Sequence, residues 1–158
     1  MRGRFIPVVW TLLRDKKRAE RFALVFLRLA LGAAFLSGIA SRFGWYGKDT
    51  GYGNFANFVR YTAEVNSFMP PSTIPFLAWA ATIAEFGFGA ALVLGLWPRI
   101  VAFGSALLLA LFGIAMAISF GIHSPLDYSV FSACAGALLL AVRAEGTREQ
   151  QESQGFVK

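Results

Sequence analysis

Four long apolar runs divide the chain, and they cover residues 22–41, 74–97, 100–120 and 126–142. About 20 consecutive apolar residues are enough for a helix to cross the hydrocarbon core of a bilayer. Each run therefore predicts a membrane-spanning helix, the last of them short, with its outer end at Pro125. Because the second and third connections are short, neighbouring helices must run antiparallel. We predict an all-α fold, an integral membrane antiparallel four-helix bundle.

The first connection is much longer and has a pattern of its own. From Phe55 to Met69 the apolar residues recur at intervals of three or four, after Asn54 and before Pro70. This spacing predicts an amphipathic helix between spans 1 and 2, with Asn54 as its N-cap and a proline at its end. Such a helix either covers the mouth of the bundle or is an ordinary connector at the outer interface.

Composition supports a membrane protein. Of 158 residues, 56% are hydrophobic and 15% are charged, and the net charge is +6. The positive charge is concentrated before the first span, at Arg2, Arg4, Arg14, Lys16, Lys17, Arg18 and Arg21. Basic residues beside spans favour the cytoplasmic side, so both termini are expected there, and nucleic-acid binding is not.

Three regions follow from these patterns. Residues 1–21 form a basic cytoplasmic leader that lacks a cleavage site and is either an interfacial helix or disordered. Residues 22–142 form the four-helix domain, and residues 143–158 form a polar cytoplasmic tail.

The scarcity of metal-binding and redox-active side chains limits the chemistry. Cys134 is the only cysteine and His123 the only histidine. One chain therefore offers no internal disulfide, no thiol pair, no bis-histidine haem and no ordinary zinc site. We expect no metal and no covalent cofactor.

Two ionisable residues, Arg28 and Glu85, fall deep within predicted spans. A charge at the centre of a span costs about 2.5 to 3.5 kcal/mol, so both should face the interior and find a partner. Counted from the inner ends of their spans, their depths differ by about 9 Å, which a long arginine side chain or a water can bridge. We predict that they pair, either as a structural link between helices or as contacts for a polar ligand; an unpaired Glu85 would stay protonated.

A second polar cluster is predicted at the outer face. His123 and Asp127 bracket a turn beside Tyr128, with Arg42 expected nearby at the outer end of span 1. A carboxylate beside a histidine suits acid-base chemistry, but a capped turn explains the same residues and is the favoured interpretation.

The stretches "RLALGAAFLSGIASRFG", with Arg28, and "AEFGFGAALVLGLWPRIVAFGSALLLA", with Glu85, resemble the DoxX-like family of small four-span membrane proteins. The resemblance covers about residues 24–142. It implies a multi-pass protein of the bacterial cytoplasmic membrane, in a family linked to quinone-coupled oxidation and oxidative-stress complexes. The chain has no flavin, haem or iron–sulfur motif, so any redox activity would need a bound quinone or an oxidoreductase partner.

Three functions follow as hypotheses. In the first, the chain is a membrane subunit of a quinone-linked oxidoreductase, with Arg28, Glu85, Trp79 and Phe86 as ligand-binding candidates. In the second, it is a non-catalytic membrane anchor or assembly scaffold for a soluble partner. The third, a small-solute or proton carrier, has few ionisable groups to support it, although a homo-oligomer would multiply them.

Overall fold

The computed structural model describes residues 15–155, and it describes side chains for residues 15–144. Most of the predicted leader, residues 1–14, lies outside the described residues. Within them all regular structure is helical, which confirms the all-α fold. The elements are α2 (Lys16–Arg42), α3 (Phe55–Val65), the 3₁₀ turn η1 (Pro71–Thr73), α4 (Ile74–Leu94), α5 (Pro98–Phe120), α6 (His123–Asp127) and α7 (Val130–Gly155).

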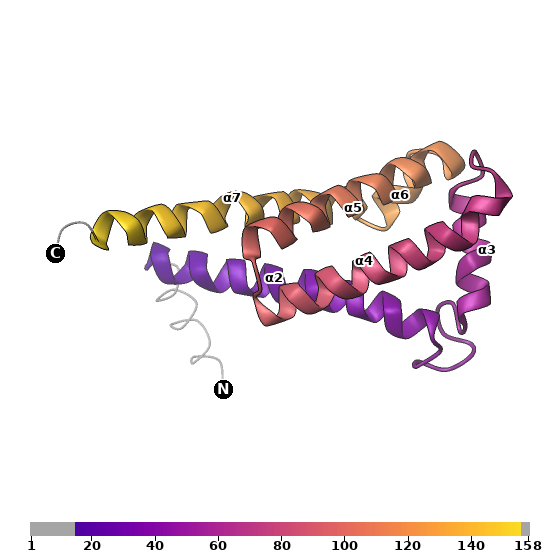
Figure 1. Ribbon diagram of the computed structural model, residues 1–158, viewed down its shortest axis with the longest axis horizontal. Coiled ribbons are helices and arrows are strands. Elements are labelled where there is room, and N and C mark those ends of the chain that lie inside the picture. The colour runs from indigo at the N-terminus through magenta and orange to yellow at the C-terminus, as the bar shows by residue number, and fades with distance from the viewer. Residues whose placement is uncertain (1–14, 156–158) are drawn as a thin grey trace, which may run out of the picture.

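The four long helices form an antiparallel bundle (Figure 1). Helices α2 and α5 run in one direction, and α4 and α7 return in the other. The most extensive packing joins α5 to α7 and α2 to α4, while α4 with α5 and α2 with α7 complete the ring. Helix α3 lies across one end, here called the α3 end. The start of α2 and the end of α7 lie at the opposite end, here called the far end.

Three of the helical segments are long and apolar enough to cross a membrane, namely Lys16–Arg42, Pro71–Leu94 and Pro98–Phe120. The fourth apolar segment, Val130–Ala144, is shorter. At 1.5 Å per residue it extends about 22 Å, which is less than the roughly 30 Å of a typical hydrocarbon core.

The fourth helix begins later than predicted. Pro125 is not its first residue but is buried inside the short helix α6. Ser129 then adopts a φ of 54°, a left-handed conformation that ends a right-handed helix. Helix α7 therefore starts at Val130, and it continues to Gly155 through most of the predicted polar tail.

The first helix begins earlier than predicted. Asp15 is its N-cap, with a carboxylate that accepts a hydrogen bond from Arg18 N and pairs with the Arg18 side chain. A capping aspartate satisfies backbone donors at a helix start. Helix α2 therefore incorporates residues 16–21 of the predicted leader. At about 40 Å, its 27 residues make it long for a simple span.

The amphipathic helix is confirmed as α3. Asn54 is its N-cap and accepts a hydrogen bond of 2.9 Å from Asn57 N. Its buried face consists of Phe58, Thr62 and Val65. The helix ends at Val65, before the prolines, and Asn66 caps it, with its backbone N–H and its side-chain amide both donating to Thr62 O.

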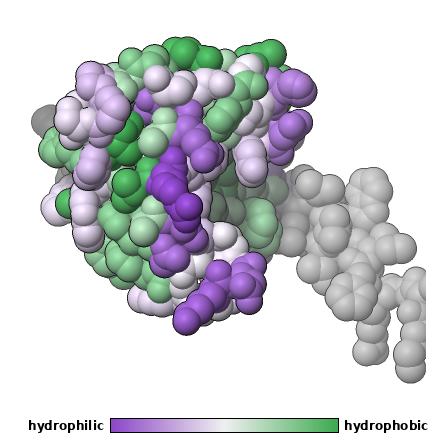
Figure 2. Space-filling model, turned by 90° about the vertical axis from the view of Figure 1, so that its right-hand side faces the viewer, coloured by the Kyte–Doolittle hydropathy of each residue, from purple (hydrophilic) through white to green (hydrophobic). Residues whose placement is uncertain are grey.

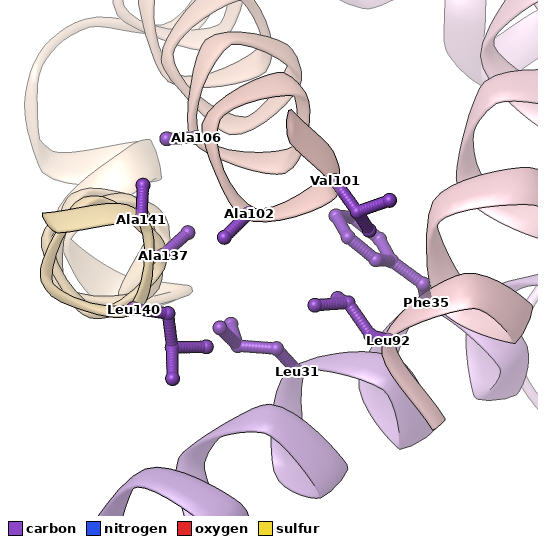
Figure 3. Packing of buried hydrophobic residues seen from close by; sticks show 9 residues of the cluster. All are labelled: Leu31, Phe35, Leu92, Val101, Ala102, Ala106, Ala137, Leu140 and Ala141. Carbon is purple, nitrogen blue, oxygen red and sulfur yellow. The ribbon is translucent and has the colours of Figure 1, made fainter. Parts of the chain in front are cut away.

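The apolar core, drawn from close by in Figure 3, takes residues from the end of α4 and the start of α5, so it lies in the half of the bundle nearer the far end. All four long helices contribute to it: Leu31, Phe35, Leu92, Val101, Ala102, Ala106, Ala137, Leu140 and Ala141. The alanines of α5 and α7 let these two helices approach closely. Large apolar side chains also cover the outside of the bundle, for example Phe76, Ile83 and Ile100, each more than 60% exposed. An apolar outer surface is what a lipid environment requires.

Candidate functional site

Glu85 lies on the inner face of α4. The buried positions of this helix are Ile74, Ala78, Thr82, Glu85, Gly89 and Leu92, at intervals of three or four residues. This spacing places them on one side of a helix. Glu85 is only 4% exposed, so the prediction that this carboxylate faces the interior is confirmed.

The partner of Glu85 is Arg42, the last residue of α2. Nη2 of Arg42 lies 2.5 Å from Oε1 of Glu85, and both side chains are buried. The predicted pairing of Glu85 with Arg28 is therefore wrong. A Cβ atom at Gly38 would lie 3.2 Å from Oε2 of Glu85. Glu85 is therefore level with Gly38, which precedes Arg42 by one helical turn. Arg28 precedes Gly38 by ten residues of α2, which corresponds to about 15 Å along the helix axis.

Thr82 completes the contacts of Arg42 with α4. Its hydroxyl accepts a hydrogen bond of 3.1 Å from Nη1 of Arg42 and donates one of 2.7 Å to Ala78 O. Thr82 was not among the residues predicted for the site. It precedes Glu85 by three residues, and this spacing, which places both on the same helix face, could have indicated that Thr82 belongs to the site.

Helix α3 covers the pair from the α3 end. The guanidinium of Arg42 stacks on Phe58, with Cζ 3.8 Å from the ring centroid, a cation–π contact. Arg42 therefore contacts α3 and α4 as well as belonging to α2. Its Nε is buried and has no hydrogen-bond partner among the described residues.

Tyr52, in the loop before α3, lies beside this group. Its backbone N–H donates a hydrogen bond of 3.0 Å to Ser41 Oγ, and its ring packs against Phe58 and Tyr61. Burial, and to a smaller extent the neighbouring Tyr61, raises the pKa of the Tyr52 phenol to about 12, against a lowering effect of Arg42. Tyr52 is thus neutral at physiological pH and keeps a proton to donate.

The surface of the α3 end is polar in its middle. Figure 2 shows hydrophilic residues gathered across this end, with hydrophobic residues around them. An aromatic cluster (Phe43, Phe55, Phe58 and Trp79) lies at the side of this end. Phe55 is at its centre, with ring-centroid distances of 5.8 Å to Phe43, 4.5 Å to Trp79 and 5.9 Å to Phe58. Phe43 and Trp79 are about half exposed, so the cluster links the apolar outer surface to the buried Arg42.

None of the remaining predicted ligand contacts, Trp79, Phe86 and Arg28, touches the Arg42–Glu85 pair directly, although Trp79 borders the site through Phe55. Trp79 and Phe86 are 49% and 58% exposed, so they face outward and not into the bundle. Arg28 is half-buried, and its guanidinium fills the space beside Gly95, where α4 ends.

The predicted outer-face cluster does not assemble around Arg42. His123, Asp127 and Tyr128 are all exposed, in and just after α6, whereas Arg42 is buried against Glu85. His123 and Asp127 lie at the two ends of α6. Tyr128 is close enough to Tyr61 to contribute, after burial, to a raised pKa of the Tyr61 phenol.

Chemically, the site is a buried ion pair in which Nε–H of Arg42 is a hydrogen-bond donor without an acceptor among the described residues. Glu85 and Thr82 fix two nitrogens of Arg42, and Phe58 fixes the plane of the guanidinium. The Nε–H and the neutral Tyr52 phenol are then both donors, next to aromatic rings. This arrangement suits an uncharged ligand with acceptor oxygens and a flat apolar body.

Comparison with known proteins agrees with the fold and with the resemblance noted in the sequence. The family model described as DoxX matches residues 23–122. The match runs from α2 through α5 and includes Arg28, Arg42 and Glu85, and it ends before α6. Searches of curated proteins and of solved structures gave no significant match. With the apolar helices described above, the match identifies a multi-pass membrane protein, and the chain belongs to the DoxX family.

Proposed function

We propose that the chain is the membrane subunit of a quinone-linked oxidoreductase or oxidative-stress complex, and that it holds a quinone head group beside the Arg42–Glu85 pair. The observation that carries the proposal is the buried Nε of Arg42, which has no acceptor among the described residues although its neighbours hold the rest of the guanidinium in place. A buried donor without an acceptor costs about 1 to 3 kcal/mol. A carbonyl oxygen would supply the missing acceptor.

The other groups at the site suit the same ligand. A quinone has two carbonyl oxygens on a flat ring, and beside the cationic Arg42 the uncharged Tyr52 phenol offers a second donor. Phe58 and Tyr61 provide aromatic surface next to these donors. A bound quinone supplies two-electron redox chemistry that the side chains of this protein lack. The protein would bind and orient the head group and shield it from water.

The aromatic cluster gives the ligand a route. Quinones dissolve in the apolar phase of a membrane, and Phe43 and Trp79 are exposed on the apolar side of the bundle. Phe55 connects these two rings to Phe58, which stacks on Arg42. We infer that the ring enters sideways along this cluster, with Trp79 at its start. Electrons would come from an oxidoreductase partner, as the chain contains no redox centre motif of its own.

The arrangement in the membrane is part of the proposal. Exposed basic residues of the far end, Lys16, Lys17, Arg18 and Arg21, outnumber the exposed basic residues Lys48 and Arg60 near the α3 end. Positive charge is retained on the cytoplasmic side. The far end would therefore face the cytoplasm of a bacterial cell, with the quinone site near the opposite surface.

A quinone titration tests the proposal. The purified chain in detergent is titrated with decylubiquinone while its tryptophan fluorescence is followed, because Trp79 belongs to the aromatic cluster. We expect saturable quenching that weakens about tenfold in Tyr52→Phe, which loses one hydrogen bond to the ligand. Phe86→Leu, on an exposed surface away from the pair, is the matched control and should bind like the wild type. A linear, non-saturating response in the wild type would remove the proposal.

The alternative, an anchor or assembly scaffold, is favoured by a different observation. Arg42 joins α2, α3 and α4 through an ion pair, a hydrogen bond and a ring contact, which is what a purely structural link would do. In that case the exposed basic far end would hold a soluble partner. Deletion of residues 2–18 should then release a co-purifying partner, whereas Tyr52→Phe should change neither partner retention nor quinone response.

A further inference from the structure

A second arginine, Arg28, lies away from the Arg42 site and is half-buried. It projects from α2 toward the C-terminus of α4, where Gly95 has a φ of 73° and no side chain to occupy the space. Nε of Arg28 is buried and has no hydrogen-bond partner among the described residues. The carbonyls at a helix C-terminus attract a cation, and this explains the position of Arg28 but leaves its Nε without an acceptor among the described residues.

The acidic side chains that the structure describes near the far end form ion pairs with arginines other than Arg28. Asp15 pairs with Arg18, and Glu20 pairs with Arg143. Glu85, which was expected to neutralise Arg28, pairs with Arg42. None of these three acids therefore forms an ion pair with Arg28 among the described side chains.

Arg28 also belongs to a basic row on α2. Lys17, Arg21 and Arg28 are separated by four and seven residues, a spacing that places all three on one face of a helix. Lys17 and Arg21 are exposed. The row extends from beside the end of α4 toward the far end over about 16 Å.

Apolar surface adjoins the row. Leu29, Val93 and Trp97 are 41%, 38% and 68% exposed, and Val93 packs against Gly32 where α2 meets α4. Trp97 follows closely after Gly95, and tryptophan is enriched where the head groups of a membrane meet its hydrocarbon core. A cation, an interfacial tryptophan and an apolar surface thus occur together at one depth.

We propose that Arg28, with Arg21 and Lys17, binds the phosphate of an anionic phospholipid at the end of α4. Arg28 donates to the phosphate oxygens from Nε and the guanidinium fork, a geometry that suits phosphate. Arg21 and Lys17 extend into the head-group region, and an acyl chain lies along Leu29 and Val93. The site is independent of the quinone proposal, since it shares no residue with it.

Native mass spectrometry of the purified full chain tests this site, with dioleoyl phosphatidylglycerol and dioleoyl phosphatidylcholine as probes. We expect one phosphatidylglycerol to bind saturably. Phosphatidylcholine should bind about tenfold more weakly, because its choline cation cancels the charge of the phosphate and so weakens the contact with the arginines. Arg28→Gln should weaken phosphatidylglycerol binding about tenfold. Arg60→Gln, which removes an exposed arginine on α3, is the matched control and should bind like the wild type.

Three results would overturn the assignment: equal binding of the two lipids, equal binding by the wild type and a folded Arg28→Gln, or inorganic phosphate binding as tightly as phosphatidylglycerol. If Arg28→Gln loses its helical circular dichroism, Arg28→Lys takes its place. Lysine keeps the charge but not Nε or the fork, so binding should fall severalfold. Unchanged binding by Arg28→Lys would contradict the role given to Nε.

Discussion

Gly38 of α2 faces Glu85 of α4 so closely that a Cβ atom at position 38 would lie 3.2 Å from Oε2. The absence of a side chain at this position lets the carboxylate reach Arg42 between the two helices. A glycine of the first helix thus leaves room for the only buried ion pair among the described side chains.

A larger residue at position 38 should therefore disrupt the pair. Gly38→Val places two methyl groups against the carboxylate, and we expect it to lower the free energy of unfolding by about 1 to 3 kcal/mol, the usual cost of overpacking. Thermal unfolding in detergent measures the change. Gly87→Val is the control, because a Cβ atom at position 87 would meet no atom within 4 Å. Similar losses in both variants would contradict the steric role of Gly38.

Removing one member of the ion pair should cost more than removing both. Arg42→Leu leaves Glu85 buried without its cation, and we expect a loss of about 3 to 5 kcal/mol in stability. The double variant Arg42→Leu/Glu85→Leu leaves no charge behind and should regain most of this loss. A double-mutant cycle of unfolding free energies measures the coupling. Additive effects of the two substitutions would show that the side chains do not act as a pair.

The depth of a residue along its own span proved to be a poor guide to its partner. Counting from residue 22 placed Arg28 near the inner edge and in reach of Glu85, but α2 starts at Lys16 and passes beyond the end of α4. Arg28 consequently lies beside Gly95, at the α4 terminus, and Arg42 lies beside Glu85. The relative shift of two helices depends on how their side chains pack, and hydropathy along a single helix carries no information about it.

Other features could be predicted because they depend on local chemistry. The buried position of Glu85 follows from the cost of a charge facing lipid. The N-cap at Asn54 and the inward face of α3 follow from helix capping and periodicity. Tyr52 and Phe58 were missed as parts of the site, because only the folding of the long loop over the bundle brings them to Arg42.

Thr82 should contribute through its hydroxyl oxygen alone. Thr82→Val keeps the shape of the side chain but leaves Nη1 of Arg42 without this acceptor, and we expect a loss of about 1 to 3 kcal/mol in stability. Thr82→Ser retains the oxygen and is the matched control, with a loss of less than about 1.5 kcal/mol from the missing methyl group. Thermal unfolding of both variants is the measurement. If the serine variant were as unstable as the valine variant, the methyl group and not the hydrogen bond would be responsible.

Tyr52 should ionise only at strongly alkaline pH. Burial and the neighbouring Tyr61 raise the pKa of its phenol to about 12 from the ordinary value of 10.0. The unfolded chain therefore loses this proton first as the pH rises, and the contribution of Tyr52 to stability, complete below pH 10, should decline between pH 10 and 12. Absorbance at the tyrosinate band, compared between the wild type and Tyr52→Phe, isolates this phenol from the other three tyrosines. A difference titration centred near pH 10 would mean that Tyr52 is exposed to water and does not pack against Phe58 and Tyr61.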